Sequence, residues 1–533
     1  MTITTARRTA ARAVTRLAVR HARRTALIVL VVAVGMSTVV AATYARTVGG
    51  DADALAALAR NPAIRTLFGE PVALDTVGGF TVWRTGTVLA VLLTVYGVLL
   101  TTRVTRGEEE AHRWDLLLAG PLAPAAVLRR HLAVVIAVMA LTGTGIAVAL
   151  IVVGTPSAGA VLHTAGLALA GTFAVAVAAL AAQVFPTRAG ATGASLAVLG
   201  VALLARMVGD GVTILAWLRW LPPYGPLALA RPYQANRWPP VIVVALATIL
   251  VAYAALILAS RRDVREGLLP ASAGRRIRGR LLGSIVAFAA RRALRPLAGW
   301  SAGIAAYFLL IGLLAISLTD FLIDNPRFAD LAAQAGFGGL GTARGYAATL
   351  FALLTVPLGG FAAVRLAAFA TEEAAGRLTL LLAQPITRSH LYVAEAAVTL
   401  AGTIVLAAVA GAASWLGATF VGADLPLPAA LAGTANVLPV ALLSLTAAML
   451  AVGVTPRAVT AVGMTPTAGG FLLTALADSV HAPHWLVWAS PYTHLAAVPS
   501  TGPNWPATTA MLAAASVAGA IGGWRYRRRD LLT

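Results

Sequence analysis

Two segments that lie half a chain apart have nearly the same sequence. Residues 108–121 read EEEAHRWDLLLAGP, residues 372–385 read EEAAGRLTLLLAQP, and nine of the fourteen positions are identical. Further matches follow each copy in the same order: Trp220 with Trp488, Pro223-Tyr224 with Pro491-Tyr492, and Arg261-Arg262-Asp263 with Arg528-Arg529-Asp530. An ordered series at a spacing of 264 to 268 residues indicates a duplicated unit of domain size. We therefore expect two equivalent halves.

Charged side chains are scarce along the whole chain. Hydrophobic residues make up 59% of the sequence and charged residues 11%, whereas a soluble domain carries roughly 25% charged residues. A chain of 533 residues with this composition is expected to be a polytopic membrane protein. The chain contains no cysteine, which excludes disulfides, thiolate nucleophiles and zinc–sulfur sites.

Apolar runs of about 20 residues, the length of a helix that crosses a bilayer, predict the membrane spans. They lie at 25–44, 85–102, 131–153, 159–185, 189–209 and 240–260, and at 297–318, 345–364, 394–415, 427–452, 458–477 and 507–524. The predicted fold is an all-α polytopic membrane protein with twelve transmembrane helices, arranged as two parallel six-helix repeats. We expect a first half over 1–265, a basic cytoplasmic linker with an interfacial helix over 266–296, and a second half over 297–533.

The distribution of arginine predicts the orientation of the chain. No lysine is present, so all 41 basic residues are arginines, and the formal net charge is +21. The arginines gather before the first span, between the halves and after the last span, which is typical of cytoplasmic segments. The predicted location is the cell membrane, with both termini and both copies of the repeated segment in the cytoplasm. The charge follows membrane topology, so we predict no nucleic-acid partner.

The repeated segment is predicted to form a short cytoplasmic helix between the second and third spans. Trp114, Leu117 and Leu118 fall on one helical face, which is expected to pack against the ends of the spans. The glutamates would occupy the first turn, where the helix dipole favours them. Glu109 and Arg113 would form an exposed i,i+4 pair, as would the equivalent residues of the second copy.

One leucine of each copy, Leu116 and Leu380, points away from the face that packs on the spans. An exposed leucine that is kept in both copies favours contact with a soluble partner. The alternative is a helix that only connects two spans. We favour the docking role because a mere connection has little reason to keep its charges through duplication.

The repeated pattern Glu-Glu-x-x-x-Arg-x-x-Leu-Leu-Leu-Ala-x-Pro resembles the coupling-helix region of type-2 ABC exporter permeases. The whole chain is similar to the membrane subunits of actinobacterial polyketide-antibiotic (tetronasin-type) exporters, in which two six-span halves are fused. The resemblance implies these ATPase-coupling residues: Glu108, Glu109, Arg113, Leu116, Leu117 and Pro121, and Glu372, Glu373, Arg377, Leu380, Leu381 and Pro385. Ala374 and Gly376 replace Glu110 and His112, so the two halves are expected to dock their partners unequally.

The same resemblance implies two copies of a separate cytoplasmic ABC ATPase as partners, which would bind ATP and Mg²⁺. A phosphate-binding P-loop requires a lysine, and this chain has none. We therefore predict that the chain binds no cofactor, hydrolyses no ATP itself and has neither a catalytic nor a metal site.

Spans two and five of each half would line the substrate pathway in this family. The candidate pathway residues are Thr94, Tyr96, Phe351, Thr355 and Phe471, with Asp210 and Asp478 at the outer ends of span five. We identify no acid or base in the middle of these spans, which favours a hydrophobic or amphiphilic small molecule and disfavours proton coupling. Packing between helices, and ordinary interfacial carboxylates, are the alternative roles of these residues.

The predicted function is export of hydrophobic, drug-like compounds by alternating access, driven by the partner ATPase. The alternatives are an ion-driven secondary multidrug transporter, an exporter of a lipid, and a membrane scaffold or sensor that transports nothing. A Glu-rich helix after span two, in place of a Gly-rich Asp-Arg loop, disfavours the secondary transporter.

Overall fold

A computed structural model describes residues 3–48, 65, 69–264, 266–269, 283–324, 341–480 and 483–529. Within these ranges all regular secondary structure is helical. Eleven of the described helical segments are long and apolar enough to cross a membrane, which confirms an all-α, multi-pass membrane protein. The chain divides into two compact units, Met1–Arg275 and Arg276–Thr533, and the division falls inside the predicted linker 266–296.

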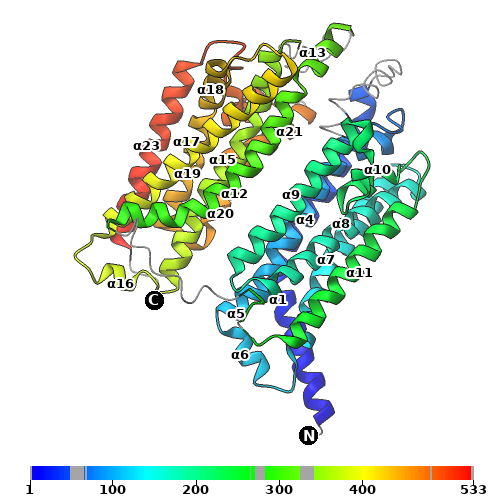
Figure 1. The fold of residues 1–533 in the computed structure, drawn as a ribbon, viewed down its shortest axis with the longest axis vertical. Helices are drawn as coiled ribbons and strands as arrows, with labels where there is room; N and C mark the ends of the chain where they lie inside the picture. The colour runs from blue at the N-terminus through cyan, green and yellow to red at the C-terminus, as the bar shows by residue number, and fades with distance from the viewer. Residues whose placement is uncertain are drawn as a thin grey trace. The chain divides into compact units, whose positions relative to one another are not determined.

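The first unit is built around six long helices that lie alongside one another (Figure 1). They are α1 (Ile3–Val48), α4 (Val77–Thr102), α7 (Pro124–Val152), α8 (Ser157–Val184), α9 (Arg188–Gly211) and α11 (Pro239–Arg261). Shorter elements are the π-helix η1 (Arg103–Gly107), α5 (Glu108–Glu110), α6 (Arg113–Leu118), the 3-10 helix η2 (Thr213–Trp220) and α10 (Tyr224–Leu229). Helix α8 packs against α4, α7, α9 and α11, and its many buried alanines allow this close approach.

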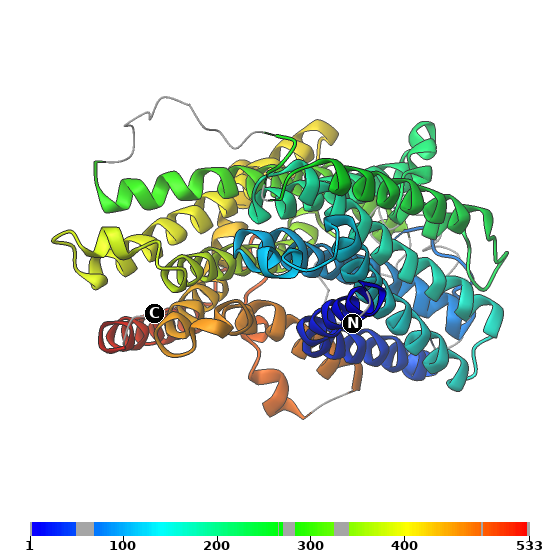
Figure 2. The same cartoon turned by 90° about the horizontal axis from the view of Figure 1, so that it is seen from below.

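The second unit is also helical, and its helices are interrupted more often. Its helices are α12 (Ile285–Leu313), α13 (Ala315–Asp324), α15 (Ala343–Ala374), α16 (Thr379–Leu382), α17 (Arg388–Val421), α18 (Leu427–Asn436), α19 (Leu438–Val454), α20 (Val459–Met464), α21 (Gly470–Val480), α22 (His484–Trp488) and α23 (Trp505–Arg528). The 3-10 helices η3 (Pro456–Ala458) and η5 (Pro491–His494) and the π-helix η4 (Thr465–Gly469) lie between them. Figure 2 shows the helices of each unit from the end at which the chain termini are marked.

The predicted span 458–477 is not among the eleven long apolar segments, and some of its side chains lie outside the described part of the chain. The chain there passes from α20 through the π-helix η4 into α21. Pro466 lies in η4, and proline both lacks an N–H donor and clashes with the preceding turn of an α-helix. The wider π turn accommodates the proline and lets the helix continue from α20 to α21.

The arginine-rich segments before spans one and seven are the first turns of long helices. Helix α1 begins at Ile3, well before the predicted span 25–44. Helix α12 begins at Ile285 and continues through Pro296 into the seventh span. The predicted interfacial helix and second half therefore share one continuous helix, and the predicted boundary at 297 falls inside it.

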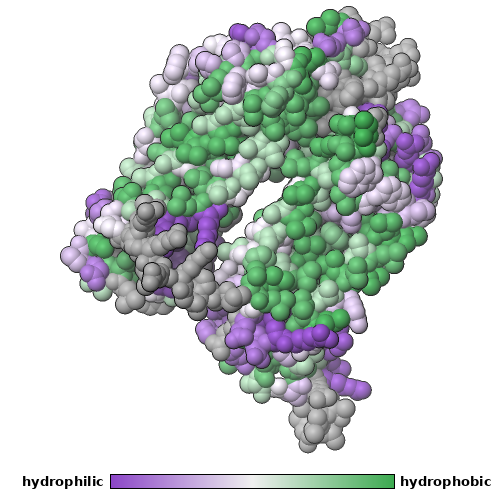
Figure 3. All heavy atoms as spheres, viewed as in Figure 1, coloured by the Kyte–Doolittle hydropathy of each residue, from purple (hydrophilic) through white to green (hydrophobic). Residues whose placement is uncertain are grey.

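The outer surface of the helices is mainly apolar, as contact with lipid requires. Figure 3 shows hydrophobic side chains over the sides of the helices and hydrophilic side chains gathered at their ends. Helix α11 is typical, because Leu246, Ile249, Leu250 and Tyr253 are all exposed. An apolar surface this extensive marks contact with a membrane.

Candidate functional site

The repeated segment folds as the end of one helix and the start of another, which differs from the single helix that its spacing predicts. In the first unit α4 continues through η1 into α5, and His112 then adopts a left-handed conformation with φ 58° before α6 begins. In the second unit α15 ends at Ala374, Gly376 has φ 71°, and α16 follows. The left-handed residue falls at the same position of both copies and breaks the helix. The glutamates therefore end span two and do not start the following helix.

The second glutamate of each copy is buried and paired with the arginine that follows the sixth span of its unit. Glu109 is 1% exposed, and it accepts hydrogen bonds from Arg262 at 2.6 Å and from Arg106 at 2.9 Å. Glu373 is likewise buried and accepts a hydrogen bond from Arg529. We call the pairs Glu109–Arg262 and Glu373–Arg529 the glutamate clamps. Each clamp joins the end of span two to the end of span six.

The first glutamate of each copy pairs with the arginine of its own motif. Glu108 contacts Arg113 at 3.1 Å, and Glu372 contacts Arg377 at 2.8 Å. The predicted i,i+4 pairs of Arg113 and Arg377 with the second glutamates are therefore wrong, because the left-handed residue shifts the register by one position. Both arginines are mostly exposed, so each pair is expected to contribute at most about 1 kcal/mol.

The third acidic residue, which only the first copy has, fixes the motif to span five. Glu110 accepts a hydrogen bond of 2.5 Å from the backbone N–H of Arg188, at the start of α9. The first N–H groups of a helix have no partner within the helix, so a carboxylate satisfies them well. Ala374 cannot make this contact, and the two copies of the motif are thus anchored differently.

The apolar face of each short helix packs on its own unit, as the spacing predicts. Trp114 is buried and stacks on His131 with ring centroids 6.0 Å apart, and Leu378 is buried at the matching position. Leu117 and Leu381 are partly buried against the same cores. Figure 1 shows α6 at the end of the first unit that carries the N-terminus, and α16 beside the C-terminus of the second.

In the first unit, the leucine that faces away from this core is exposed and available for contact with a partner. The Leu116 side chain is 79% exposed, whereas the side chain of Leu380 lies outside the described part of the chain. Pro121 and Pro385 follow the two short helices and lead into α7 and α17. The ATPase-coupling role of these residues stays a prediction.

Several candidate pathway residues hold each unit together internally. The Thr94 hydroxyl of span two lies 2.7 Å from the Tyr224 hydroxyl, and the Thr355 hydroxyl forms a hydrogen bond with Tyr492. Both tyrosines belong to the repeated Pro-Tyr positions, so in each unit the loop after span five is tied to span two. Phe351 is also buried, and it stacks on an aromatic neighbour within its unit.

The other two aromatic candidates are less enclosed. Tyr96 is partly exposed, and its hydroxyl lies 3.3 Å from that of Thr25. Phe471 is exposed and packs near Tyr492, with ring centroids 6.0 Å apart. A role of either residue in the substrate pathway stays a prediction.

Asp210 is the centre of a buried ionic network at the opposite end of the first unit. It lies 2.6 Å from Arg206 and 3.1 Å from Arg219, and Asp210 and Arg206 are both buried. Arg206 belongs to α9 and lies near the outer end of span five, where the prediction from sequence includes only Asp210. Asp478 lies in α21, and its side chain is outside the described part of the chain.

Glu70 extends this network and gives it a pH dependence. Its carboxylate accepts hydrogen bonds from Arg219 at 2.6 Å and from Arg231 at 2.7 Å. Burial raises the pKa of Glu70, but the hydrogen bond and charge of Arg219, together with Arg231, outweigh burial and lower the pKa below its usual value. A lowered carboxyl pKa stabilises the fold above the unfolded pKa of about 4.3, and this stability is lost as the pH falls through the folded pKa.

We therefore expect the melting temperature of the wild type to exceed that of Glu70→Gln by a constant amount between about pH 5 and pH 7. Below about pH 4 the difference should shrink, because the protonated Glu70 no longer pairs with the arginines. Thermal melting of the purified protein across this range measures the effect. A difference that persists unchanged to about pH 3 would contradict the assigned pairing.

The described fold is that of a multi-pass membrane protein. A family profile described as the C-terminal domain of the multidrug efflux system permease Rv1217c matches residues 12–258 and 282–527. The chain belongs to this family of multidrug efflux permeases. A relative, the multidrug efflux system permease protein Rv1217c of Mycobacterium tuberculosis, is 31% identical over 521 residues, which cover 94% of this chain and 92% of the relative. The predicted class of efflux permease is thus confirmed.

Proposed function

We propose that this chain is the membrane subunit of an ATP-driven ABC exporter, of the polyketide-antibiotic type, for hydrophobic or amphiphilic drug-like compounds. Two copies of a separate cytoplasmic ATPase would bind ATP and Mg²⁺ and supply the energy. Membership of the efflux permease family supports transport out of the cell, and the absence of lysine from the sequence supports a separate ATPase. The observation that carries the proposal is the repeated short helix, which in each unit directly follows the end of span two that is clamped to span six.

The glutamate clamps support a role of this helix in transmitting force. A force on α6 would be transmitted to span two through the Glu108–Arg113 ion pair and the left-handed turn. The same force would reach span six through the clamp Glu109–Arg262. Two spans of each unit would thus move together with the docked ATPase, which is what alternating access between rigid halves requires.

We infer twelve membrane crossings from the position of the second clamp. Glu373 ends α15 and Arg529 follows α23, and their ion pair places both ends on one side of the unit. An even number of crossings must therefore lie between them. Helix α17, the pair α18–α19 and helix α23 supply three, so the interrupted segment 459–480 supplies the fourth. Both motifs then share the arginine-rich side, which we assign to the cytoplasm.

Substitution of Leu116 and of Leu380, its counterpart in the second copy, tests the docking role. The double variant Leu116→Asp with Leu380→Asp is expected to lower co-purification of the ATPase subunit at least about tenfold, because an unpaired carboxylate in an apolar contact is costly. Drug-stimulated ATP hydrolysis by the complex should fall in parallel. The measurement is ATPase recovery and hydrolysis after affinity purification of the full complex from membranes.

The matched control is Ile214→Asp, which places the same charge at an 86% exposed apolar position of η2. Helix α9 separates η2 from the motif end of the unit, a distance of about 36 Å for its 24 residues. The control should bind the ATPase normally. Normal recovery and hydrolysis in the leucine double variant would overturn the docking role.

A further inference from the structure

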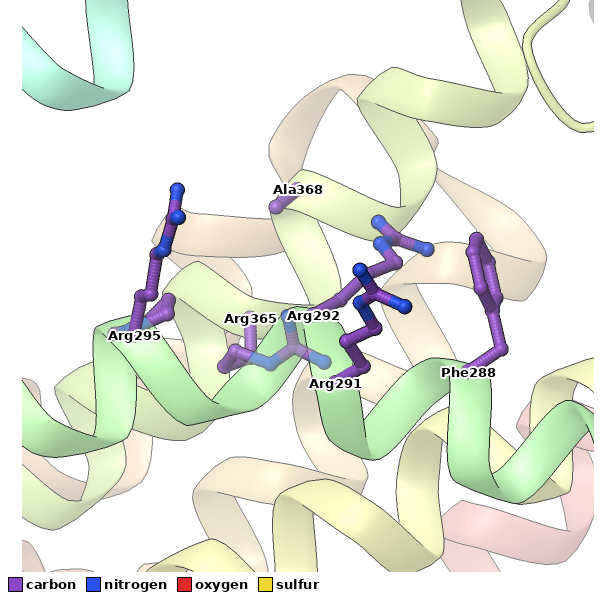
Figure 4. A pocket seen from close by; sticks show the side chains of 7 residues that line it. Phe288, Arg291, Arg292, Arg295, Arg365 and Ala368 are labelled. Carbon is purple, nitrogen blue, oxygen red and sulfur yellow. The ribbon is translucent and has the colours of Figure 1, made fainter. Parts of the chain in front are cut away.

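Four arginines of the second unit line a cavity of about 650 Å³ near the start of α12. The lining residues are Phe288, Arg291, Arg292, Arg295, Pro296, Arg365 and Ala368. Figure 4 shows that three of the arginines come from α12 and the fourth from α15, with Phe288 and Arg295 at opposite ends of the group. The cavity therefore combines a dense positive charge with an apolar wall.

The positive charge of this cavity is only partly balanced. Glu395 of α17 accepts hydrogen bonds from Arg292 at 2.9 Å and from Arg365 at 2.8 Å, and no carboxylate is among the lining residues. Glu395 thus pairs with two of the four guanidinium groups, and Arg291 has a further interaction of its own. The Arg365 side chain is 6% exposed, and its Nε has no hydrogen-bond partner among the described residues. A buried donor without a partner is costly, so an anion would complete the site.

The first unit lacks this arrangement. At the repeat spacing of 264 residues, Arg365 and Glu395 correspond to Thr101 and His131. Both Thr101 and His131 are buried, and neither supplies a guanidinium group to the surface. The duplicated fold therefore does not require the Arg365–Glu395 pair, which is absent from the matching positions of the first unit.

We propose that this cavity binds the phosphate headgroup of an anionic phospholipid. Guanidinium groups match phosphate oxygens in geometry and charge, and basic pockets at the cytoplasmic ends of membrane helices are suited to such headgroups. A lipid is favoured over free phosphate because Phe288, Pro296 and Ala368 give the wall an apolar part. Leu294, on the same turns of α12, is exposed and continues this apolar surface. The site does not depend on ATP coupling.

Lipid titration of the purified full-length protein, followed by native mass spectrometry, tests this site. The variant Arg291→Gln with Arg295→Gln keeps the ionic contacts of Glu395 and removes two charges from the cavity. It is expected to bind phosphatidylglycerol about tenfold more weakly than the wild type. Phosphatidylcholine, whose headgroup has no net charge, should bind the wild type weakly.

The control variant Arg457→Gln with Arg527→Gln removes the same charge from two exposed arginines of the same unit that do not line the cavity. It should bind phosphatidylglycerol as the wild type does. Equal affinities in all three proteins, or an equal loss in both variants, would overturn the site. Displacement of the lipid by inorganic phosphate at millimolar concentration would assign the cavity to free anions and overturn the lipid source. If the cavity variant melts abnormally without lipid, Arg295→Gln alone provides the same comparison with about half the charge loss.

Discussion

Replacement of Glu109 by alanine is expected to destabilise the protein by about 3–5 kcal/mol. Glu109 is buried between Arg106, which is fully buried, and Arg262. Its removal leaves two guanidinium groups in a site of low polarity without their counter-charge, and neither can reach water without a movement of the helix ends. Thermal melting of the purified protein in detergent measures the loss, which should appear as a large fall in melting temperature.

Glu372→Ala is the matched control, because it removes a glutamate of the same motif from a pair that is largely exposed. It should cost at most about 1 kcal/mol. Equal melting temperatures for the two variants would contradict a buried clamp. This contrast also matters for studies of coupling, because a loss of efflux in Glu109→Ala would report instability as well as any change in docking. Substitution of Leu116 and Leu380 avoids this ambiguity.

The second large effect is expected at the ionic site of the second unit. Glu395→His alone should cost about 3–5 kcal/mol, because the buried Arg365 loses its counter-charge. Arg365→Thr together with Glu395→His installs the residues that the first unit has at these positions, Thr101 and His131. This double variant should be more stable than Glu395→His by about 1–3 kcal/mol, since removal of both partners of a buried pair costs far less than removal of one.

A double-mutant cycle on melting temperature and denaturant resistance measures this coupling. The partly exposed Arg292, which also contacts Glu395, can turn toward water in the double variant. Arg365→Thr alone provides the fourth corner of the cycle. Strictly additive losses, with the double variant the least stable of the three, would show that Arg365 and Glu395 do not act as a pair.

The sequence predicted the helical class and most spans because a run of about 20 apolar residues identifies a membrane helix. The segment 458–477 is helical as predicted, but Pro466 lies in a π turn, a local effect that hydropathy does not record. The prediction of one continuous coupling helix in each copy is wrong because a single residue breaks it. His112 and Gly376 differ in type but share a left-handed backbone, and helical periodicity cannot register one such residue.

The ionic partners of the motif could not be derived from periodicity. Arg262 and Arg529 lie more than 150 residues from the glutamates that they contact, so only the folded chain shows the pairing. The sequence did hold a signal, because the Arg-Arg-Asp triplet recurs in step with the motif. The triplet was recognised as a landmark of the repeat, but no property of a single copy indicated that its second arginine meets the second glutamate.

The contacts of two buried threonine hydroxyls could not be predicted from the sequence either. Thr94 and Thr355 were chosen as pathway residues because they are polar groups within apolar spans. Their hydroxyls instead contact Tyr224 and Tyr492, which the sequence places in loops after span five. A threonine in a span is equally consistent with packing and with a pathway, and only the folded chain shows which tyrosine its hydroxyl contacts.

Transport by purified components is the most direct test of an ATP-powered exporter. The full-length chain, alone or with its ATPase partner, is reconstituted in liposomes, and movement of a fluorescent hydrophobic drug is followed after addition of ATP. We predict transport only when the ATPase and ATP are both present, and its loss in Leu116→Asp with Leu380→Asp. Drug transport by the chain alone, driven by a pH gradient and indifferent to ATP, would contradict the account.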